Sequence, residues 1–392
     1  MNKQTNTPEL RFPEFDEEWE KRKLGEVVNY KNGGSFESLV KNHGVYKLIT
    51  LKSVNTEGKL CNSGKYIDDK CVETLCNDTL VMILSEQAPG LVGMTAIIPN
   101  NNEYVLNQRV AALVPKQFID SQFLSKLINR NQKYFSVRSA GTKVKNISKG
   151  HVENFNFLSP DYTEQQKIGN FFSKLDRQIE LEEKKLELFE QQKKGYMQKI
   201  FSQQLRFKDE NGNDYPKWEN KLLGNLVNIT MGQSPSSKNY TENSNYTTLV
   251  QGNADLNNGY IQPRIYTKQI TKLAEVNDIL LTVRAPVGKI GRAQLKACIG
   301  RGVCAIKGDS FIYYFLELFD LQNKWIRFSQ GSTFESISGN EIKNIDIAYP
   351  INEERQKISE FLSKLDELLK NQLLKVEQLK QRKHGLLQNM FV

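Results

Sequence analysis

The chain has 392 residues and a net charge of +9, with 39% hydrophobic and 25% charged residues. This composition excludes a wholly disordered chain, a collagen-like chain and a small disulfide-stapled protein. No apolar stretch approaches the ~20 residues of a membrane-spanning helix, and the polar segment from Met1 to Arg11 is unlike a signal peptide. We therefore expect a cytoplasmic protein. Its positive charge favours an anionic partner, with nucleic acid as the first candidate.

Short strand and helix signals alternate through the first 160 residues. Strands are predicted at 46–50, 80–84 and 105–114, and helical apolar spacing covers 118–135. A later region has the same order, with strands predicted at 249–251, 279–283 and 303–306 and helical spacing at 311–328. Segments 233–246 and 252–263 are rich in Ser, Asn, Gly and Tyr, which predicts loops. Both regions are therefore predicted to be mixed α/β globules, although strand order does not follow from the pattern.

Each globule is followed by a long segment with a seven-residue repeat. Segments 160–201 and 350–391 align without a gap at a constant offset of 190, and Glu182/Gln372 and Lys193/Lys383 interrupt both repeats at the same places. The apolar seam consists of Ile168, Phe172, Leu175, Ile179, Leu186 and Phe189 in the first segment, and Ile358, Leu362, Leu365, Leu369, Val376 and Leu379 in the second. A heptad pattern of this length predicts a coiled coil. Two matching copies favour an antiparallel pair, and the alternative is an amphipathic helix packed on its own domain.

The globules also repeat, more loosely. Leu10-Arg11-Phe12 recurs as Leu205-Arg206-Phe207, and Trp19 recurs as Trp218. We therefore predict two domains at 1–160 and 206–350, with helical regions at 161–205 and 351–392. The expected fold class is α+β: two mixed α/β domains in tandem, each followed by a long helix, with the helices paired as an antiparallel coiled coil of pseudo-two-fold symmetry.

The surplus positive charge lies mainly on the globules. Segment 161–201 carries eight basic and eight acidic residues, and segment 351–392 carries eight and six. Lys and Arg neutralise phosphates, and Arg, Asn and Gln can bind base edges, so we predict DNA contacts from polar loops that follow strands. The candidates are Lys52, Ser53, Asn55, Glu86, Gln87, Arg138, Thr142, Lys143 and Lys145 in the first globule, and Gln251, Asn253, Arg284, Lys289, Arg292, Ser332 and Thr333 in the second. For any single residue, a solvated surface position is the more frequent explanation, so the prediction concerns the loops together.

Motifs of catalysis and metal binding are missing. The segment around Gly288-Lys289 lacks the earlier glycine and the hydroxyl of a phosphate-binding loop, and no GxSxG or HExxH motif occurs. The chain has no Pro-Pro dipeptide, as an amino-methyltransferase motif would need. The five cysteines form no CxxC pair, and the three histidines are far apart in sequence, so we predict no metal site. These absences favour a recognition protein over an enzyme.

The repeated helical segments and the opening of the chain resemble the specificity subunit of type I restriction–modification systems. The resemblance depends on E-Q-Q-K-I-G-N-F-F-S-K-L-D at 164–176, E-R-Q-K-I-S-E-F-L-S-K-L-D at 354–366, and the opening P-E-L-R-F-P-E-F. It implies two target-recognition domains, each binding one half of an asymmetric bipartite site in double-stranded DNA. It also implies that the paired helices set the spacer and dock two methyltransferase subunits.

Further partners follow from the same resemblance. Motor/nuclease subunits would join for cleavage, and the partner subunits would hold S-adenosylmethionine, ATP and Mg, leaving this chain without a cofactor. Two other functions stay open on the sequence alone. One is a coiled-coil scaffold with protein-binding globules, and the other is an enzyme whose site assembles from scattered acidic residues.

Overall fold

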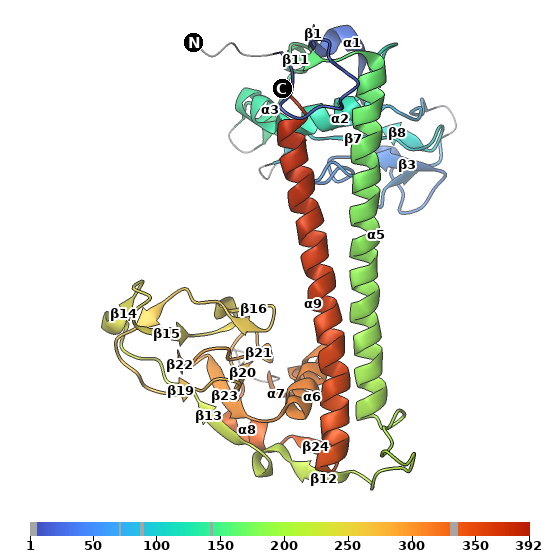
Figure 1. Ribbon diagram of the computed structural model, residues 1–392. Coiled ribbons are helices and arrows are strands. Elements are labelled where there is room, and N and C mark those ends of the chain that lie inside the picture. Colours follow the sequence, from blue (N-terminus) through green and yellow to red (C-terminus); the bar gives the residue numbers. More distant parts are fainter. Residues whose placement is uncertain (1–5, 70–71, 87–89, 142–143, 330–335) are drawn as a thin grey trace. The chain divides into compact units, whose positions relative to one another are not determined.

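The protein is seen as a computed structural model that describes residues 6–69, 72–86, 90–141, 144–329 and 336–392 (Figure 1). The chain divides into two compact units. Unit 1 consists of Met1–Glu183 and Leu374–Val392, and unit 2 consists of Lys184–Leu373. Each unit therefore contains one globule and a part of both long helices.

Unit 1 builds its globule from short strands and short helices. In chain order these are β1 (Glu20–Lys23), α1 (Leu24–Val27), β2 (Val28–Asn32), η1 (Glu37–Leu39), β3 (Tyr46–Ile49), β4 (Tyr66–Ile67), β5 (Leu80–Ile83), β6 (Ser85–Glu86), β7 (Thr95–Ile97), β8 (Tyr104–Leu106), β9 (Val110–Pro115), α2 (Ser121–Arg130), α3 (Gln132–Arg138), β10 (Lys145–Asn146), α4 (Lys149–Glu153) and β11 (Asn156–Ser159). The main sheet has the order β2-β9-β5-β7, and a second sheet has the order β4-β3-β8. The pair β3–β8 is parallel, and the main sheet is antiparallel.

Unit 2 repeats this plan with additional strands. Its elements are β12 (Glu219–Leu222), η2 (Leu223–Asn225), β13 (Asn228–Met231), η3 (Ser237–Asn239), β14 (Tyr240–Thr241), β15 (Thr247–Val250), η4 (Asn253–Asp255), β16 (Leu256–Asn257), β17 (Tyr260–Ile261), β18 (Tyr266–Thr267), β19 (Leu273–Ala274), β20 (Ile279–Thr282), β21 (Ile290–Arg292), β22 (Ala297–Ile299), β23 (Val303–Lys307), α6 (Ser310–Leu321), α7 (Ile326–Ser329), α8 (Gly339–Lys343) and β24 (Asp346–Tyr349). The sheets have the orders β13-β23-β20-β21-β17-β16 and β14-β18-β15-β22-β19. The order β13-β23-β20-β21 corresponds to β2-β9-β5-β7, and the parallel pair β15–β22 corresponds to β3–β8.

Three predicted elements are interrupted. The strand predicted at 105–114 is split into β8 and β9, because residues 107–109 form a turn in which Arg109 has a φ of 64°. The helix predicted at 118–135 ends at Asn131, whose side chain donates to the Leu127 carbonyl at 2.8 Å and caps α2. The helix predicted at 311–328 ends after Leu321, where Asn323 has a left-handed φ of 54°. The segments predicted as loops also contain short strands, namely β14, β16 and β17.

The long helices are α5 (Tyr162–Phe201) and α9 (Asn352–Asn389), and they pair within each unit (Figure 1). In unit 1, Asp176 is 2.6 Å from Lys383, and Glu182 is 2.5 Å from Lys375. Position numbers rise along α5 as they fall along α9, so the pairing is antiparallel. In unit 2, Lys193 lies 2.6 Å from Asp366, and the rings of Tyr196 and Phe361 are 5.1 Å apart, in the same sense.

The predicted seam residues are all withdrawn from solvent. Ile168, Phe172, Leu175, Ile179, Ile358, Leu362 and Val376 are buried, and Leu186, Phe189, Leu365, Leu369 and Leu379 are half-buried. The C-terminal ends of the helices also pack on the globules: the ring of Phe391, just after α9, lies 5.3 Å from that of Phe123 of α2 in unit 1, and the ring of Phe201 lies 5.0 Å from that of Phe311 of α6 in unit 2. Each helix therefore does both things considered above, pairing with the other helix and packing on a domain. The predicted fold class is confirmed.

Each globule is tied to the helix that follows it by a buried ion pair. In unit 1, Arg11 donates two hydrogen bonds to Glu164, at 2.8 and 2.7 Å. In unit 2, Arg206 donates two to Glu354, at 3.1 and 2.6 Å. Both glutamates are completely buried. The repeated Leu-Arg-Phe sequence thus has a structural cause, because its arginine fixes the entry of each globule against the start of its helix.

Candidate nucleic-acid interface

One short turn in each unit joins the two sheets. In unit 1 it spans residues 107–109, between β8 and β9, and in unit 2 it spans 300–302, between β22 and β23. We call both of them the connecting turn. Because β8 and β22 belong to the smaller sheets and β9 and β23 to the larger ones, loops from both sheets can gather here.

Backbone hydrogen bonds show that loops from both sheets gather at the connecting turn of unit 1. Four separate segments bond to the connecting turn, to its immediate neighbours or to one another. The bonds are Gly33 N–H to Val110 O (3.2 Å), Gly34 N–H to Leu106 O (3.1 Å), Asn107 N–H to Ile49 O (3.0 Å), Leu84 N–H to Arg109 O (3.0 Å) and Ile147 N–H to Leu84 O (3.0 Å). The turn is therefore surrounded by the chain after β2, after β3, after β5 and after β10.

Unit 2 has the same five bonds. They are Gly232 N–H to Val303 O (3.0 Å), Gln233 N–H to Ile299 O (2.9 Å), Gly300 N–H to Val250 O (2.8 Å), Val283 N–H to Gly302 O (2.9 Å) and Ile337 N–H to Val283 O (3.0 Å). A glycine is required at the first position, because a Cβ on Gly33 would lie 1.9 Å from Asn107 O and one on Gly232 would lie 2.1 Å from Gly300 O. Two globules with divergent loops thus share one backbone arrangement.

Several predicted DNA-contact residues of unit 1 belong to the segments around its turn. Lys52 follows β3 and is exposed, and Lys145 is exposed in β10, which pairs with β6. Arg138 is exposed and stacks on the Tyr134 ring, 3.8 Å from the ring centroid. Its neighbour Ala140 pairs with Asn146, which brings the end of α3 beside β10. These side chains supply positive charge along one edge of the globule.

Two candidates in the loop after β3 have structural roles. Ser53 is completely buried, and its hydroxyl accepts the Thr50 N–H at 2.9 Å, so its prediction as a DNA contact is wrong for this conformation. Asn55 is half-buried, and its side-chain oxygen accepts the N–H groups of Glu57 and Lys59. It shapes the loop that presents Lys52.

In unit 2, three candidates lie at the corresponding edge. Gln251 follows β15 and donates from its side chain to the Tyr240 hydroxyl at 2.8 Å. Asn253 is exposed at the start of η4. Arg284 is exposed after β20, and its backbone pairs with Ser336, just as β6 pairs with β10 in unit 1. The structure therefore brings together loops that the sequence separates by up to about 85 residues.

The remaining candidates of unit 2 point elsewhere. Lys289 forms an ion pair with Asp320 of α6 at 2.9 Å. Arg292 is half-buried on the Tyr313 ring and donates to Ser310 at 2.9 Å, and it pairs with Ile279 at the opposite end of β20. Both residues therefore have partners within the protein, and their role as DNA contacts stays a prediction. Gln87, Thr142, Lys143, Ser332 and Thr333 lie outside the described residues, and for Glu86 only the backbone is described.

Two exposed arginines in the connecting turns escaped the sequence analysis. Arg109 lies in unit 1 and Arg301 in unit 2, and neither forms an ion pair with another described residue. They were hidden because 105–114 was predicted as one strand and the segment before 303 was not assigned. A polar Asn-Gln-Arg run inside an apolar strand was the signal that could have revealed the first turn.

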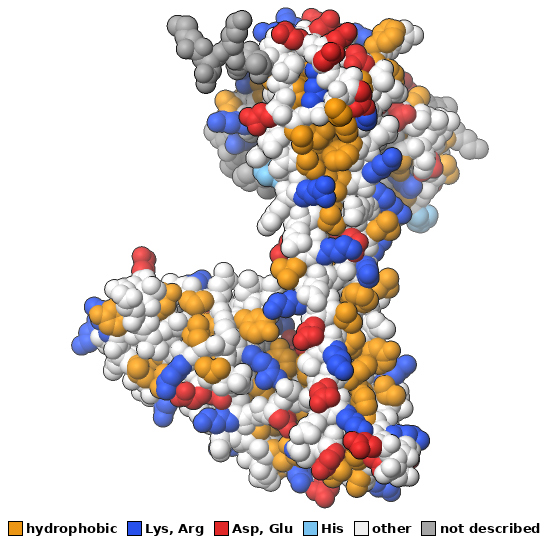
Figure 2. Space-filling model, viewed as in Figure 1, with side chains coloured by type: hydrophobic (Ala, Val, Ile, Leu, Met, Phe, Trp, Pro, Cys, Tyr) orange, Lys and Arg blue, Asp and Glu red, His pale blue; other side chains and the backbone are white. Residues whose placement is uncertain are grey.

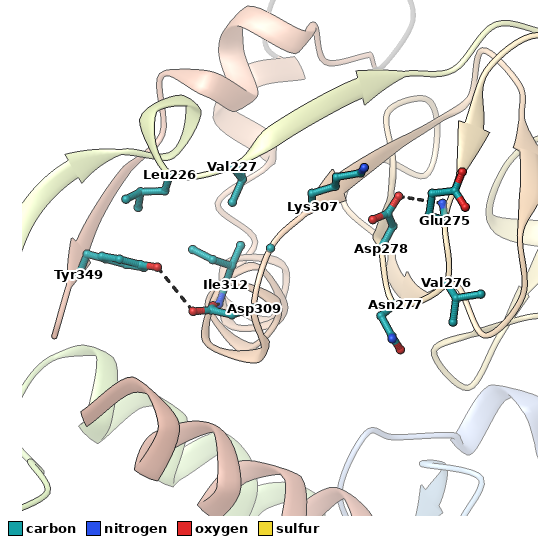
Figure 3. Close-up of a pocket in the computed structure, with 11 residues that line it drawn as sticks. Leu226, Val227, Glu275, Val276, Asn277, Asp278, Lys307, Asp309, Ile312 and Tyr349 are labelled. Atoms are coloured by element: carbon teal, nitrogen blue, oxygen red, sulfur yellow. Dashed lines mark hydrogen bonds between the residues drawn. The ribbon is translucent and has the colours of Figure 1, made fainter. Parts of the chain in front are cut away.

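A pocket in the described part of unit 2 lies at the other end of the same strands. Its volume is about 530 Å³, and Figure 3 shows its lining, which includes Glu275, Asp278, Lys307 and Asp309. Glu275 and Asp278 precede β20, whereas the connecting turn lies beside the end of β20. The pocket is consequently separate from the loops described above.

Charge on the long helices is mixed. On the face in Figure 2, Lys and Arg side chains alternate with Asp and Glu along α5 and α9. Within the described ranges, no group of His, Cys, Asp and Glu could hold a metal ion, and none of the helices there is long and apolar enough to span a bilayer. Burial raises the pKa of the Cys304 thiol to about 12, so this thiol is neutral at physiological pH.

The fold and the loop edges define a class of protein: tandem recognition domains, alike in backbone and different in surface, on two antiparallel helices. The family model for the type I restriction modification DNA specificity domain matches residues 16–191 and 215–378. The chain therefore belongs to the type I restriction–modification DNA-specificity family, as a subunit with two tandem target-recognition domains.

Relatives agree with this assignment, and a solved structure shares the fold. The chain is 26% identical to the MjaX type I restriction enzyme specificity subunit of Methanocaldococcus jannaschii, over 98% of this chain and 95% of that protein. It is 21% identical to the MjaVIII specificity subunit of the same organism, again over 98% and 95%. Among solved structures, the type I S subunit from M. genitalium has a TM-score of 0.64 at 18% identity, covering 98% of this chain and 99% of that one. This structural likeness supports the fold described above.

Proposed function

We propose that this chain is a non-catalytic subunit that directs partner enzymes to an asymmetric, bipartite site in double-stranded DNA. The observation that carries the proposal is the repeated backbone arrangement around the connecting turns, with different side chains in each copy. Equivalent frames with different loops suit two half-sites of different sequence. Residues 1–160 and 206–350 would bind one half-site each, through Lys52, Arg138 and Lys145 in the first and Gln251, Asn253 and Arg284 in the second.

The long helices would set the distance between the half-sites. Each is continuous from one unit into the other, since α5 crosses from Glu183 to Lys184 and α9 from Leu373 to Leu374. The helices, 161–205 and 351–392 with their flanks, would also dock two methyltransferase subunits, and motor/nuclease subunits would join for restriction. S-adenosylmethionine, ATP and Mg would be bound by those partners, which would modify adenines.

The modular part of the proposal is tested by domain exchange. Residues 206–350 are replaced by the corresponding segment of another family member, and the assembled methyltransferase is mapped by genome-wide adenine-methylation sequencing. We expect a new sequence in one half-site and an unchanged sequence in the other. A change in both half-sites would contradict the modular proposal.

The spacing part needs a separate variant. One heptad inserted into each helix, at 183–184 and 373–374, keeps the seam in register and adds ~10 Å. With ~3.4 Å per base pair, the unrecognised spacer should lengthen by about three base pairs. An unchanged spacer in the methylation map would reject the helices as the determinant of distance.

DNA binding separates this proposal from its rivals. With a methyltransferase partner present, recognition predicts sequence-selective affinity that falls steeply with salt. A scaffold predicts no DNA binding by the complete assembly, and an enzyme predicts turnover by the isolated chain. Either result would replace the proposed function.

A further inference from the structure

The two connecting turns carry one arginine each, although the loops around them have diverged. Arg109 is the last residue of the turn in unit 1, and Arg301 is the middle residue of the turn in unit 2. Both side chains are exposed. Around them, the other polar residues of the two edges differ in type, such as Lys52 against Asn253 and Asn146 against Ser336.

A feature shared by two otherwise different recognition surfaces suits a feature shared by two different half-sites. The bases of the half-sites differ, whereas the phosphate backbone is common to both. Phosphate contacts fix the orientation of a protein on the duplex, and base contacts supply the specificity. We propose, on the basis of the function proposed above, that Arg109 and Arg301 bind DNA phosphates and set the register of each recognition domain.

The backbone around each arginine is rigid, as an anchoring contact requires. The carbonyl of Arg109 accepts the Leu84 N–H, and the N–H of Arg301 donates to the Ser234 hydroxyl at 3.1 Å. The N–H groups of Gly33 and Gly232 bond to Val110 and Val303, the residues that follow the two turns. Each guanidinium therefore extends from a fixed turn at the point where loops of both sheets meet.

The backbone of Arg109 gives a second indication. Its φ of 64° lies in the left-handed region, which a residue with a Cβ adopts at some cost. A glycine adopts this region without that cost. Stability alone thus gives no reason for arginine at this position, because its side chain forms no ion pair with another described residue. A ligand for the side chain supplies the reason.

The test uses the complete assembly with its methyltransferase partner, and duplexes carrying either the mapped recognition site or a scrambled site. Arg109→Gly and Arg301→Ala are compared with Lys21→Ala and Lys217→Ala, which remove exposed lysines of β1 and of the segment before β12. We expect each arginine variant to bind both duplexes about tenfold more weakly, the loss expected for one charged hydrogen-bonded contact. The slope of log affinity against log salt should fall by about one. The lysine variants should match the wild type.

A shifted arginine distinguishes a phosphate contact from a base contact. The double variant Gln108→Arg with Arg109→Gly moves the side chain to the middle of the turn, as in unit 2. A flexible guanidinium still reaches a phosphate from there, but it loses the geometry of a bidentate base contact, so most of the affinity should return. The melting temperature of Arg109→Gly should be no lower than that of the wild type, because glycine relieves the left-handed φ, and this separates loss of binding from loss of folding.

Three results would each have a distinct meaning. If the wild-type assembly binds neither duplex, the proposed function itself fails. If the wild type binds and the arginine variants bind equally well, these residues do not contact DNA. If the loss is confined to the recognition site and the salt slope is unchanged, the arginines contact bases, and the phosphate proposal is wrong.

Discussion

In unit 1, a lysine of the globule lies against the long helices, whereas in unit 2 the globule supplies a glutamate. Asp176 of α5 pairs with Lys383 of α9 and with Lys126 of α2. In unit 2, Lys193 of α5 pairs with Asp366 of α9 at 2.6 Å and with Glu317 of α6 at 2.7 Å. The Asp–Lys pair is the same in both repeats, and the third charge has the opposite sign.

This difference shows how a constant pair of helices can hold divergent domains. An aspartate beside a lysine offers one partner for a cation and one for an anion, so a globule of either charge can dock. The electrostatic consequences differ between the units. Burial lowers the pKa of Lys126 more than Asp176 raises it. Burial also lowers the pKa of Lys193, but the charges of Glu317 and Asp366 outweigh burial and raise the pKa.

The Arg–Glu ion pairs offer a second comparison. Glu354 of unit 2 accepts hydrogen bonds from Arg206 and also from the Trp218 indole, at 2.8 Å. In unit 1, Glu164 accepts from Arg11, and the indole N–H of the equivalent Trp19 is buried without a hydrogen-bond partner among the described residues. Unit 2 therefore has a three-residue network where unit 1 has a pair.

Replacing the arginine of either ion pair should lower the free energy of unfolding more than any of the other substitutions. Arg11→Ala leaves the completely buried Glu164 without its cationic partner, which costs about 3 kcal/mol. Arg206→Ala should cost less, about 2 kcal/mol, because the Trp218 indole still donates to Glu354. Denaturant unfolding of the full chain, with hydrogen exchange at the first turns of α5 and α9, measures both. A larger cost for Arg206→Ala would contradict the comparison.

Replacing each aspartate with asparagine should lower the free energy of unfolding by different amounts in the two charged clusters. Asp176→Asn leaves Lys126 and Lys383 facing each other, whereas Asp366→Asn leaves the Lys193–Glu317 pair intact. We expect a loss of about 2 kcal/mol for the first and about 1 kcal/mol for the second, since the pairs are only partly exposed. Hydrogen exchange in α2 and α6 reports each unit by itself. Equal losses would mean that the sign of the third charge has no energetic consequence.

The sequence was sufficient for the helices and the duplication, for a clear physical reason. A heptad seam such as Ile168, Phe172 and Leu175 is local information, and so is its recurrence at Ile358, Leu362 and Leu365. The heptad register also marked Lys193 and Lys383 as polar residues in the seam. Both turned out to pair with an aspartate of the other helix.

The sequence was insufficient where tertiary contacts decide. Lys126 and Asp176 are 50 positions apart, and only the packing of α2 on α5 brings them together. Ser53 was predicted to contact DNA from its residue type, but burial decides its role. Arg109 was missed because a turn inside an apolar run resembles a continuous strand. Loop positions after strands were predicted, and the contacts of individual side chains were not.

Replacing the two tryptophans should give a smaller difference in stability between the units. Trp218→Phe removes the hydrogen bond to the Glu354 carboxylate, which costs about 1.5 kcal/mol in addition to the lost packing. Trp19→Phe removes a buried N–H that has no hydrogen-bond partner in the described part of the chain, so we expect only packing to be lost. The difference between the two melting temperatures, with Phe155→Leu and Phe311→Leu as packing controls, measures the hydrogen bond. A greater loss for Trp19→Phe would mean that its indole has a partner in solution.

Lowering the pH should give the smallest difference in stability between the two charged clusters, with opposite signs for Asp176 and Glu317. Burial would raise the pKa of Asp176, but Lys126 and Lys383 outweigh it and hold the pKa below its ordinary 3.8, whereas burial raises the pKa of Glu317 above its ordinary 4.5. The contribution of Asp176 is present above its unfolded pKa and is lost as the pH falls through its folded pKa. The contribution of Glu317 is present below its unfolded pKa and is lost as the pH rises through its folded pKa. As the pH falls from about 6 to about 3, the wild type should therefore lose stability relative to Asp176→Asn. Over the same range, it should gain stability relative to Glu317→Gln. Each change should be less than ~1 kcal/mol. Shifts in the same direction for both variants would mean that the opposite third charges do not determine how the two units respond to acid.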